Sequence, residues 1–186
     1  SGKTYVGARM ILELVRAGRK VGITSNSHKV ISNLLTALCE AAEETHTKLS
    51  IVQKPNEGDG CEHKFVTQTD DNGKVLERLQ SGEAQIAAGT TWLWSREEFA
   101  GSVDVLLVDE AGQMSLANVL AISPAAESVV LLGDPNRVNT DLARLQAVTA
   151  ADIQRVMKKY FTATNRLVIY YLPEAAKTST TGGSGK

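Results

Sequence analysis

Short apolar runs recur along the chain, and each run ends in small or polar residues. The most continuous is Val103–Val108, which stops at the adjacent acids Asp109 and Glu110. Runs this short and this apolar are typical of strands buried on both faces of a parallel sheet. Similar runs are Lys20–Thr24, Leu49–Gln53, Ala84–Ala88 and Ser128–Leu132. The pattern therefore predicts a strand at each of these places.

Segments with helical spacing separate the apolar runs. In Tyr5–Ala17 the apolar residues recur every three or four positions, and Gly18 follows as a stop signal. Further helices are expected at Lys29–Glu44, Lys74–Gln80 and Ser115–Ile122, whereas Thr67–Asn72 is expected to be a loop. Strands that alternate with helices predict a three-layer α/β fold with a mostly parallel sheet.

Composition sets the broad class of the protein. The 186 residues are 42% hydrophobic and 22% charged, with a formal net charge of −1. This is the composition of a globular protein with one domain or a little more. A charge so close to zero gives no overall signature of a nucleic-acid-binding protein, but a single groove can still be basic.

The cysteines and the hydropathy pattern bear on location. Cys39 and Cys61 lie far apart without the spacing of a metal motif, which favours reduced thiols in an intracellular, cytoplasmic protein. A zinc site built on Cys61 and His63 is not expected. Neither a signal peptide nor a long apolar span is present in the sequence, so no membrane partner is expected.

The acidic pair after Val103–Val108 stands where ligands gather in open α/β sheets, at the carboxyl end of a strand. There Asp109 can hold a magnesium ion and Glu110 can orient a water molecule. Taken alone, the same residues are more typical of a strand followed by an acidic turn. Ser1–Thr4 reads SGKT, the second half of the phosphate-binding pattern G-x-x-x-x-G-K-[ST]. Because a helix follows, its first amides would face phosphate.

Two polar segments at strand ends have more than one interpretation. Ser25–His28 suits contacts to a nucleic-acid backbone, but Asn26 or Ser27 can equally cap the following helix. Trp92 and Trp94 lie close to the end of another strand and can stack on bases. Packing of both tryptophans against the sheet is the preferred interpretation.

Together these segments resemble the first RecA-like domain of superfamily 1 helicases, in the DEAxQ branch. The resemblance covers residues 1–136 and implies a RecA-like P-loop NTPase sheet whose ATPase is coupled to single-stranded DNA or RNA. The resembling motifs are GKT at 2–4 (motif I), ITSNSHKVISNLL at 23–35 (Ia), AGTTWLWSR at 88–96 (Ic), VLLVDEAGQM at 105–114 (II) and LLGDPN at 131–136 (III).

The resemblance implies ATP and Mg²⁺ as cofactors and assigns roles to individual residues. The nucleotide site would comprise Gly2, Lys3, Thr4, Gln113 and Asp134, with Lys3 reaching the phosphates and Gln113 coupling this site to the strand-binding surface. Thr4 and Asp109 would be the magnesium ligands, and Glu110 would activate the attacking water. Single-stranded nucleic acid would lie along Ser25, Ser27, His28, Thr90 and Thr91.

Three departures distinguish this chain from the family pattern. The strand and glycines expected before GKT are absent, Arg137 stands where a γ-phosphate-sensing Gln is expected, and no second RecA-like domain follows. Because the sequence opens on Ser1 without an initiator methionine, we also expect a fragment, a processed product or an engineered protein. Since arginines of the second domain would stabilise the transferred phosphoryl group, neither efficient hydrolysis nor translocation is expected.

Residues 136–174 resemble a different family, the C-terminal segment of pitrilysin and mitochondrial-processing-peptidase zinc peptidases. The metal motif HxxEH of that family is missing from the sequence, so peptidase activity is not expected. The chain thus looks like a chimera that joins near residues 133–137. We expect a RecA-like domain at 1–136, an appended helix-strand segment at 137–173 and a Gly/Ser/Thr-rich tail at 174–186.

The appended segment offers a helix, Thr149–Tyr160, and an apolar strand, Leu167–Leu172. Loss of the family's first strand would expose side chains worth on the order of 10 kcal/mol, comparable to the stability of a whole domain. We therefore hypothesise that Leu167–Leu172 replaces that strand in the sheet. An edge left unpaired would instead favour self-association.

Three functional interpretations follow from the sequence. The first is an ATP- and magnesium-binding RecA-like domain, incomplete as an ATPase. The second is a folded chimeric or engineered protein without catalytic activity. The third is a protein that binds single-stranded nucleic acid without ATPase activity.

Overall fold

A computed structural model describes residues 2–133 and Ala151, with side chains from Thr4 onward. The chain separates into two units, residues 1–141 and 142–186, and the sheet and its helices belong to the first. The hypothesised strand Leu167–Leu172, the tail at 174–186 and the helix at 149–160 apart from Ala151 lie outside the described residues.

The described residues of the first unit form one six-stranded sheet in which every pair of neighbours is parallel. The strand order is β3-β2-β4-β1-β5-β6, so β1 and β4 are central and β6 forms one edge. The strands are β1 (Val21–Thr24), β2 (Ile51–Gln53), β3 (Val66–Gln68), β4 (Ile86–Ala88), β5 (Val103–Val108) and β6 (Ala126–Leu131).

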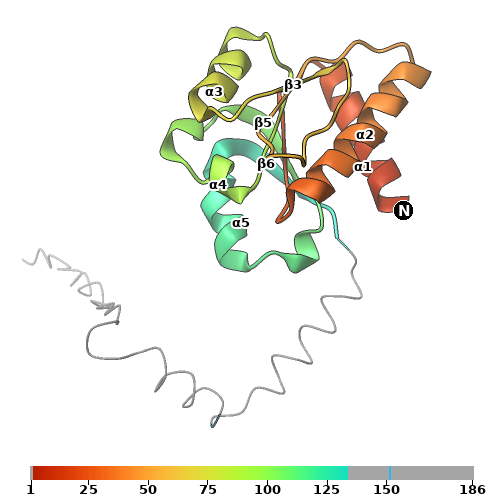
Figure 1. The fold of residues 1–186 in the computed structure, drawn as a ribbon. Coiled ribbons are helices and arrows are strands. Elements are labelled where there is room, and N and C mark those ends of the chain that lie inside the picture. Colours follow the sequence, from red (N-terminus) through yellow and green to blue (C-terminus); the bar gives the residue numbers. More distant parts are fainter. Residues whose placement is uncertain (1, 134–150, 152–186) are drawn as a thin grey trace, which may run out of the picture. The chain divides into compact units, whose positions relative to one another are not determined.

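Helices cover both faces of the sheet and complete three layers (Figure 1). One layer is formed by α1 (Gly2–Arg16) and α2 (His28–Glu44), and the other by α3 (Asn72–Ser81), α4 (Thr91–Trp94) and α5 (Leu116–Ile122). Three short 3₁₀ helices lie in the connections at η1 (Glu97–Phe99), η2 (Ala111–Gln113) and η3 (Ser123–Ala125). The structure therefore confirms the predicted three-layer α/β fold and is consistent with a RecA-like arrangement.

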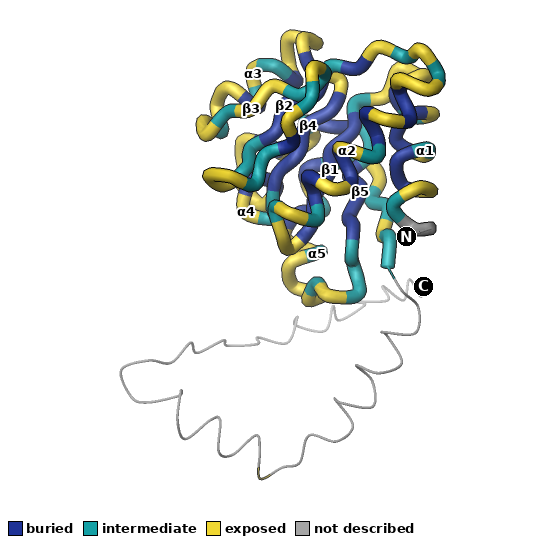
Figure 2. Tube along the Cα trace, turned by 45° about the vertical axis from the view of Figure 1, so that its right-hand side comes forward, coloured by how far each residue is buried: buried dark blue, intermediate teal, exposed yellow. Residues whose placement is uncertain are grey.

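Alternation along the strands divides the core into two layers. Leu107 of β5 packs with the cluster beneath α1 and α2, whereas Leu106 and Val108 pack with the cluster beneath α3, α4 and α5. Figure 2 shows the central strands buried between these two layers. Because both faces of the central strands are covered, their sequences are continuously apolar rather than alternating.

One predicted loop contains a strand, since Val66–Gln68 of the segment around Thr67–Asn72 forms β3. Its residues are half-buried or exposed and, in the part of the chain that the structure describes, pair only with β2. An edge strand of this kind lacks the apolar run by which a buried strand is identified. The prediction of a loop was therefore wrong at Thr67 and Gln68, while α3 begins at Asn72.

The two tryptophans of α4 have opposite environments. Trp94 is 1% exposed, and its Nε1 donates to the carbonyls of Ile23 and Gly89, at 3.2 Å each. Gly22 makes room for this ring, because a methyl group there would lie 2.7 Å from the Trp94 side chain. Packing is thus confirmed for Trp94 and wrong for Trp92, which is 83% exposed.

The neighbouring strands β1 and β4 form a topological switch point. The helix after β1, α2, packs on one face of the sheet, while the helix after β4, α4, packs on the other. The chain therefore leaves the two strand ends in opposite directions and opens a crevice between them. In open α/β sheets such crevices are the usual ligand sites.

Candidate functional site

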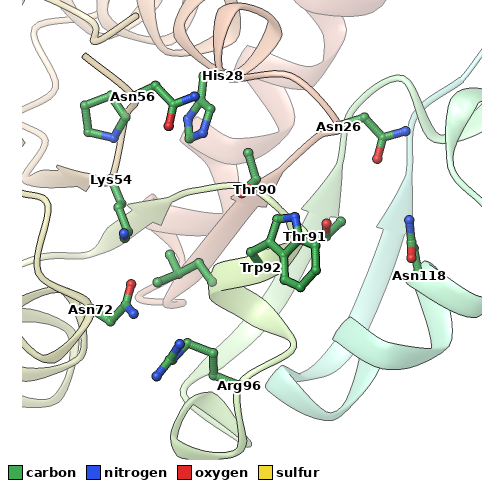
Figure 3. A pocket seen from close by; sticks show the side chains of 12 residues that line it. Asn26, His28, Lys54, Asn56, Asn72, Thr90, Thr91, Trp92, Arg96 and Asn118 are labelled. Carbon is green, nitrogen blue, oxygen red and sulfur yellow. The ribbon is translucent and has the colours of Figure 1, made fainter.

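A polar pocket of about 650 Å³ lies at the switch point (Figure 3). Its walls come from the segments after β1, β2 and β4 and from the first residues of α3 and α5. The lining residues are Asn26, His28, Lys54, Pro55, Asn56, Asn72, Thr90, Thr91, Trp92, Leu93, Arg96 and Asn118. A volume of this size accommodates a ligand as large as one or two nucleotides.

The pocket combines an exposed aromatic ring with cationic groups. Trp92 lies on its wall with Lys54 and Arg96, whose side chains extend into the same pocket (Figure 3). The Arg96 guanidinium is partly neutralised by an ion pair with Glu98. Amide and hydroxyl groups supply most of the remaining lining, so the pocket suits a polar, negatively charged ligand with flat ring faces.

His28 is the titratable ring of this pocket. Burial lowers the pKa of His28, the Asp59 carboxylate opposes that shift, and the Lys54 ammonium adds to it. Its Nδ1 is buried and makes no hydrogen bond within the described part of the chain. His28 is therefore neutral near pH 7, and the cationic character of the pocket comes from Lys54 and Arg96.

The acidic pair lies on the other side of β1, where β5 ends. Asp109 is 5% exposed, its backbone N–H donates to the Thr24 carbonyl at 2.8 Å, and its Oδ1 accepts from the Glu110 N–H at 2.8 Å. Glu110 has left-handed backbone angles, φ 54° and ψ 38°. That conformation costs about 1–3 kcal/mol in a residue with a Cβ, and such strain is concentrated at functional sites.

The first turns of α1 reach the same edge of the sheet. Since α1 leads into the start of β1, its own first residues lie at the carboxyl ends of the strands. A methyl group on Gly7 would lie 2.8 Å from Leu132 Cδ1, so α1 approaches Leu132 closely there. Leu132 in turn hydrogen-bonds to Val108 and Ala111, at 2.8 Å each. Thr4, one turn before Gly7, therefore belongs to the same neighbourhood as the acidic pair.

Gln113 links the acidic pair to the pocket. Its side-chain Nε2 donates to Glu110 Oε2 at 3.2 Å, and its backbone carbonyl accepts from Asn26 Nδ2 at 2.8 Å. Asn26 lines the pocket. Two hydrogen bonds thus connect Glu110 with the wall of the switch-point pocket.

The predicted nucleic-acid residues separate into two groups. His28, Thr90 and Thr91 line the same pocket. A single bound strand would need these three residues to lie together in this way. Ser25 is buried, and Ser27 occupies the N-cap position of α2 without a side-chain capping bond. Gly2, Lys3 and Thr4 all lie in the first turn of α1, but the side chain of Lys3 and the whole of Asp134 fall outside the described residues.

Sequence reasoning missed several pocket residues, because they come from segments far apart in the chain. Lys54 and Asn56 follow β2, Asn72 begins α3, and Asn118 lies in α5. Each comes directly after a strand or near the start of a helix, which is a usable but weak signal. Their convergence depends on the strand order, which local pattern does not give.

Comparison with known proteins adds no assignment to this geometry. No family model matches the chain, and no curated protein matches it either. No described helix is both long and apolar enough to cross a membrane. Among the described residues, no group of three or more His, Cys, Asp and Glu side chains forms a metal cluster.

Proposed function

We propose that the first unit binds a nucleoside triphosphate with magnesium at the edge formed by α1 and the end of β5, as the helicase resemblance implies. The observation that supports this most is the close approach of Gly7 to Leu132, whose backbone hydrogen-bonds to the residues on either side of the acidic pair, Val108 and Ala111. A helix N-terminus and an acidic strand end at one place suit a phosphate and a cation together.

The donor atoms present fit magnesium. Asp109 and Thr4 offer a carboxylate and a hydroxyl oxygen, the hard donors that Mg²⁺ binds while keeping several waters and phosphate oxygens. When bound, magnesium would neutralise charge on the phosphate oxygens. Lys3 would contact phosphate, and Glu110, held by Gln113, would orient a water. Arg137 replaces the expected γ-phosphate-sensing Gln, so the proposal is for binding rather than efficient turnover.

Thermal unfolding with ATP and magnesium tests the proposal. A ligand at ten times its dissociation constant should raise the Tm by about 3–6 °C, and Asp109→Asn or Lys3→Ala should abolish that rise. Asp70→Asn, which changes an exposed acid before α3, serves as the matched control and should leave the rise intact. No rise at millimolar ATP would favour the interpretation of a folded chimera without activity.

The switch-point pocket supports a second candidate function, binding of single-stranded nucleic acid. Lys54 and Arg96 can contact phosphates, while Thr90, Thr91 and the pocket amides can donate to backbone oxygens. The pocket lies at the site that open α/β sheets use for ligands. This candidate needs no ATPase activity, although the Asn26–Gln113–Glu110 hydrogen bonds could connect the two sites.

Salt titration of oligonucleotide binding tests the second candidate. Affinity should fall with salt, with a slope of about −0.7 for each phosphate neutralised on a single strand. Lys54→Gln should lower the magnitude of the slope by about that amount. Lys48→Gln, an exposed lysine before β2 and hence at the opposite edge of the sheet, should not change it. A slope unaltered by Lys54→Gln would contradict binding at this pocket.

We also propose a cytoplasmic location, which is supported by the two cysteines. Cys39 and Cys61 are both buried free thiols. Burial and the neighbouring Cys61 raise the pKa of Cys39 to about 12, so its thiol stays protonated. Protonated, buried thiols suit a reducing compartment.

A further inference from the structure

We infer that Trp92 is a stacking platform that holds one unpaired nucleobase in the switch-point pocket. This inference rests on the second candidate function, the binding of single-stranded nucleic acid. It adds a residue and a mode of contact that the helicase motifs do not assign. The exposure of Trp92, the anchoring of α4 and the charge of the pocket support this role.

The indole of Trp92 is exposed where a buried ring would be expected. It is 83% exposed, although its neighbours Leu93 and Trp94 are 2% and 1% exposed. A large apolar ring left in solvent marks a contact surface when polar groups surround it. Here the ring lies on the wall of a cavity, in a pocket otherwise lined largely by amides, hydroxyls and cations.

The helix that carries Trp92 is firmly held. Trp94 Nε1 donates to two backbone carbonyls, those of Ile23 in β1 and Gly89 after β4. Leu93 packs so closely on Gly89 that a methyl group there would lie 2.5 Å from Leu93 Cδ2. Because both neighbours are fixed in the core, the Trp92 backbone is fixed too, and a ligand need not order it on binding.

The charge of the pocket selects the class of ligand. Lys54 and Arg96 line the same cavity as Trp92, which disfavours a cationic ligand on the ring face. The polar lining disfavours an apolar protein segment. A nucleotide satisfies both conditions, because its phosphates suit the cations and its base offers a flat face to the indole.

Stacking has a measurable signature that phosphate binding lacks. An abasic strand keeps the phosphates of an oligonucleotide and loses every ring face. Wild-type protein should therefore bind dA12 at least about tenfold more tightly than an abasic 12-mer at the same salt concentration. Binding of dA12 should also quench tryptophan fluorescence, since one of the two tryptophans is exposed in the pocket.

Variants at Trp92 separate stacking from folding and from charge. Trp92→Ala should bring the two affinities within threefold and remove the quenching, while the salt slope stays unchanged because the phosphate contacts remain. Trp92→Phe should restore part of the preference for dA12. Tyr5→Ala, which removes an exposed ring on α1, is the matched control and should keep the full preference.

Two outcomes would overturn the inference. If wild-type protein binds dA12 and the abasic strand within threefold, the single-strand function stands and the stacking role of Trp92 is wrong. If neither strand binds at low salt, the single-strand function and the stacking role are both wrong. A preference for dA12 that survives Trp92→Ala would place the stacking contact elsewhere and equally contradict the assignment.

Discussion

His28 shows how one residue can connect the pocket to stability. Its ring lies at the start of α2, its Nδ1 is buried without a hydrogen bond among the described residues, and burial lowers its pKa. A histidine of this kind is tolerated as a neutral ring, because burial disfavours its protonated form and the Lys54 ammonium adds a smaller penalty. The Asp59 carboxylate only partly offsets this effect.

Stability should fall on acidification as a result. The folded-state pKa of His28 is depressed, so the unfolded chain takes up the proton first as the pH drops below the unperturbed value of about 6.5. The stability of the folded state is then lost progressively until the folded-state pKa is passed. Unfolding of the wild type and His28→Gln between pH 7.5 and pH 5 measures this. The Tm of His28→Gln relative to that of the wild type should rise as the pH falls from 7.5 to 5.

A constant Tm difference over that range would show that His28 does not titrate differently in the folded and unfolded states. His46 offers a control, because it lies in the exposed turn after α2. His46→Gln should leave the pH profile of stability close to that of the wild type.

At the scale of single residues, local pattern placed the acidic pair correctly at the end of a strand and failed at Trp92. Asp109 and Glu110 were predictable because an apolar run followed by acids is a signal within a few residues. Trp92 and Trp94 carry the same local signal, and their environments differ only because α4 presents one ring to the sheet and the other to the pocket. Which ring is buried depends on how α4 packs on the sheet, and the sequence pattern does not predict that packing.

Helix caps show the same contrast between elements. Asp71 caps α3, since its Oδ1 accepts from the N–H groups of Gly73 and Lys74 at 2.7 and 3.4 Å. Ser27 holds the corresponding position in α2 and makes no side-chain capping bond. Capping by Asn26 or Ser27 was one interpretation of the sequence, and Ser27 makes no such bond, whereas Asp71 caps α3 although no cap was predicted there.

Substitution of the two caps should therefore have different effects. Asp71→Ala should lower the free energy of unfolding by about 1 kcal/mol, because it leaves two helix-terminal donors without that acceptor. Ser27→Ala should change it by less than about 0.3 kcal/mol, since no capping bond is lost. Denaturant unfolding measures both. Asp70→Ala, an adjacent acid without a capping role, is the control, and equal losses for Asp71→Ala and Asp70→Ala would contradict the assignment.

At the scale of elements, the buried strands were predictable and the edge strand was not. β5 and β1 lie in the middle of the sheet, so burial on two faces imposes a continuous apolar run on each. β3 has one neighbour and three mostly exposed residues, Val66–Gln68, so burial imposes little on its sequence. Its backbone pairing with β2, rather than its side chains, makes it a strand.

The whole molecule explains why the pocket could be anticipated only in part. Four lining residues, Asn26, His28, Thr90 and Thr91, follow the adjacent strands β1 and β4 and were visible as polar strand ends. Lys54, Asn72 and Asn118 join them only because β2, β3 and α5 are brought to the same edge by the strand order. The position of a site at a switch point therefore follows from the strand order, whereas the residue types that line it can be read from the sequence.

A second surface, beside α1 and β6, is apolar rather than polar. A groove of about 710 Å³ lies between the outer face of α1 and strands β5 and β6, lined by residues such as Val6, Met10 and Val130. Of the seven exposed large apolar side chains among the described residues, four are on α1 or β6: Tyr5, Val6, Met10 and Leu131. Within the described part of the chain, β6 pairs with β5 alone, so its outer edge offers backbone groups beside this surface.

These features predict self-association through a second copy of the chain. A twofold contact between two β6 edges would run antiparallel, continue the sheet and set the two α1 helices antiparallel to each other. On α1, Arg9 and Glu13 border the groove but are paired within the chain, with Glu44 and Arg16 at 2.8 and 2.6 Å, so apolar contact rather than charge would stabilise the association. The β6 edge is thus complementary to itself in backbone pairing.

Sedimentation velocity over a range of protein concentrations measures this association. The wild type should show a dimer that increases with concentration, and Val6→Glu should weaken it at least about tenfold, because a carboxylate would be buried against an apolar surface. Val6 is 51% exposed, so the substitution removes little from the core. Leu120→Glu on α5, at 62% exposure, is the matched control and should leave the dimer intact. A monomer at every concentration, or equal loss in both variants, would contradict association through β6 and α1.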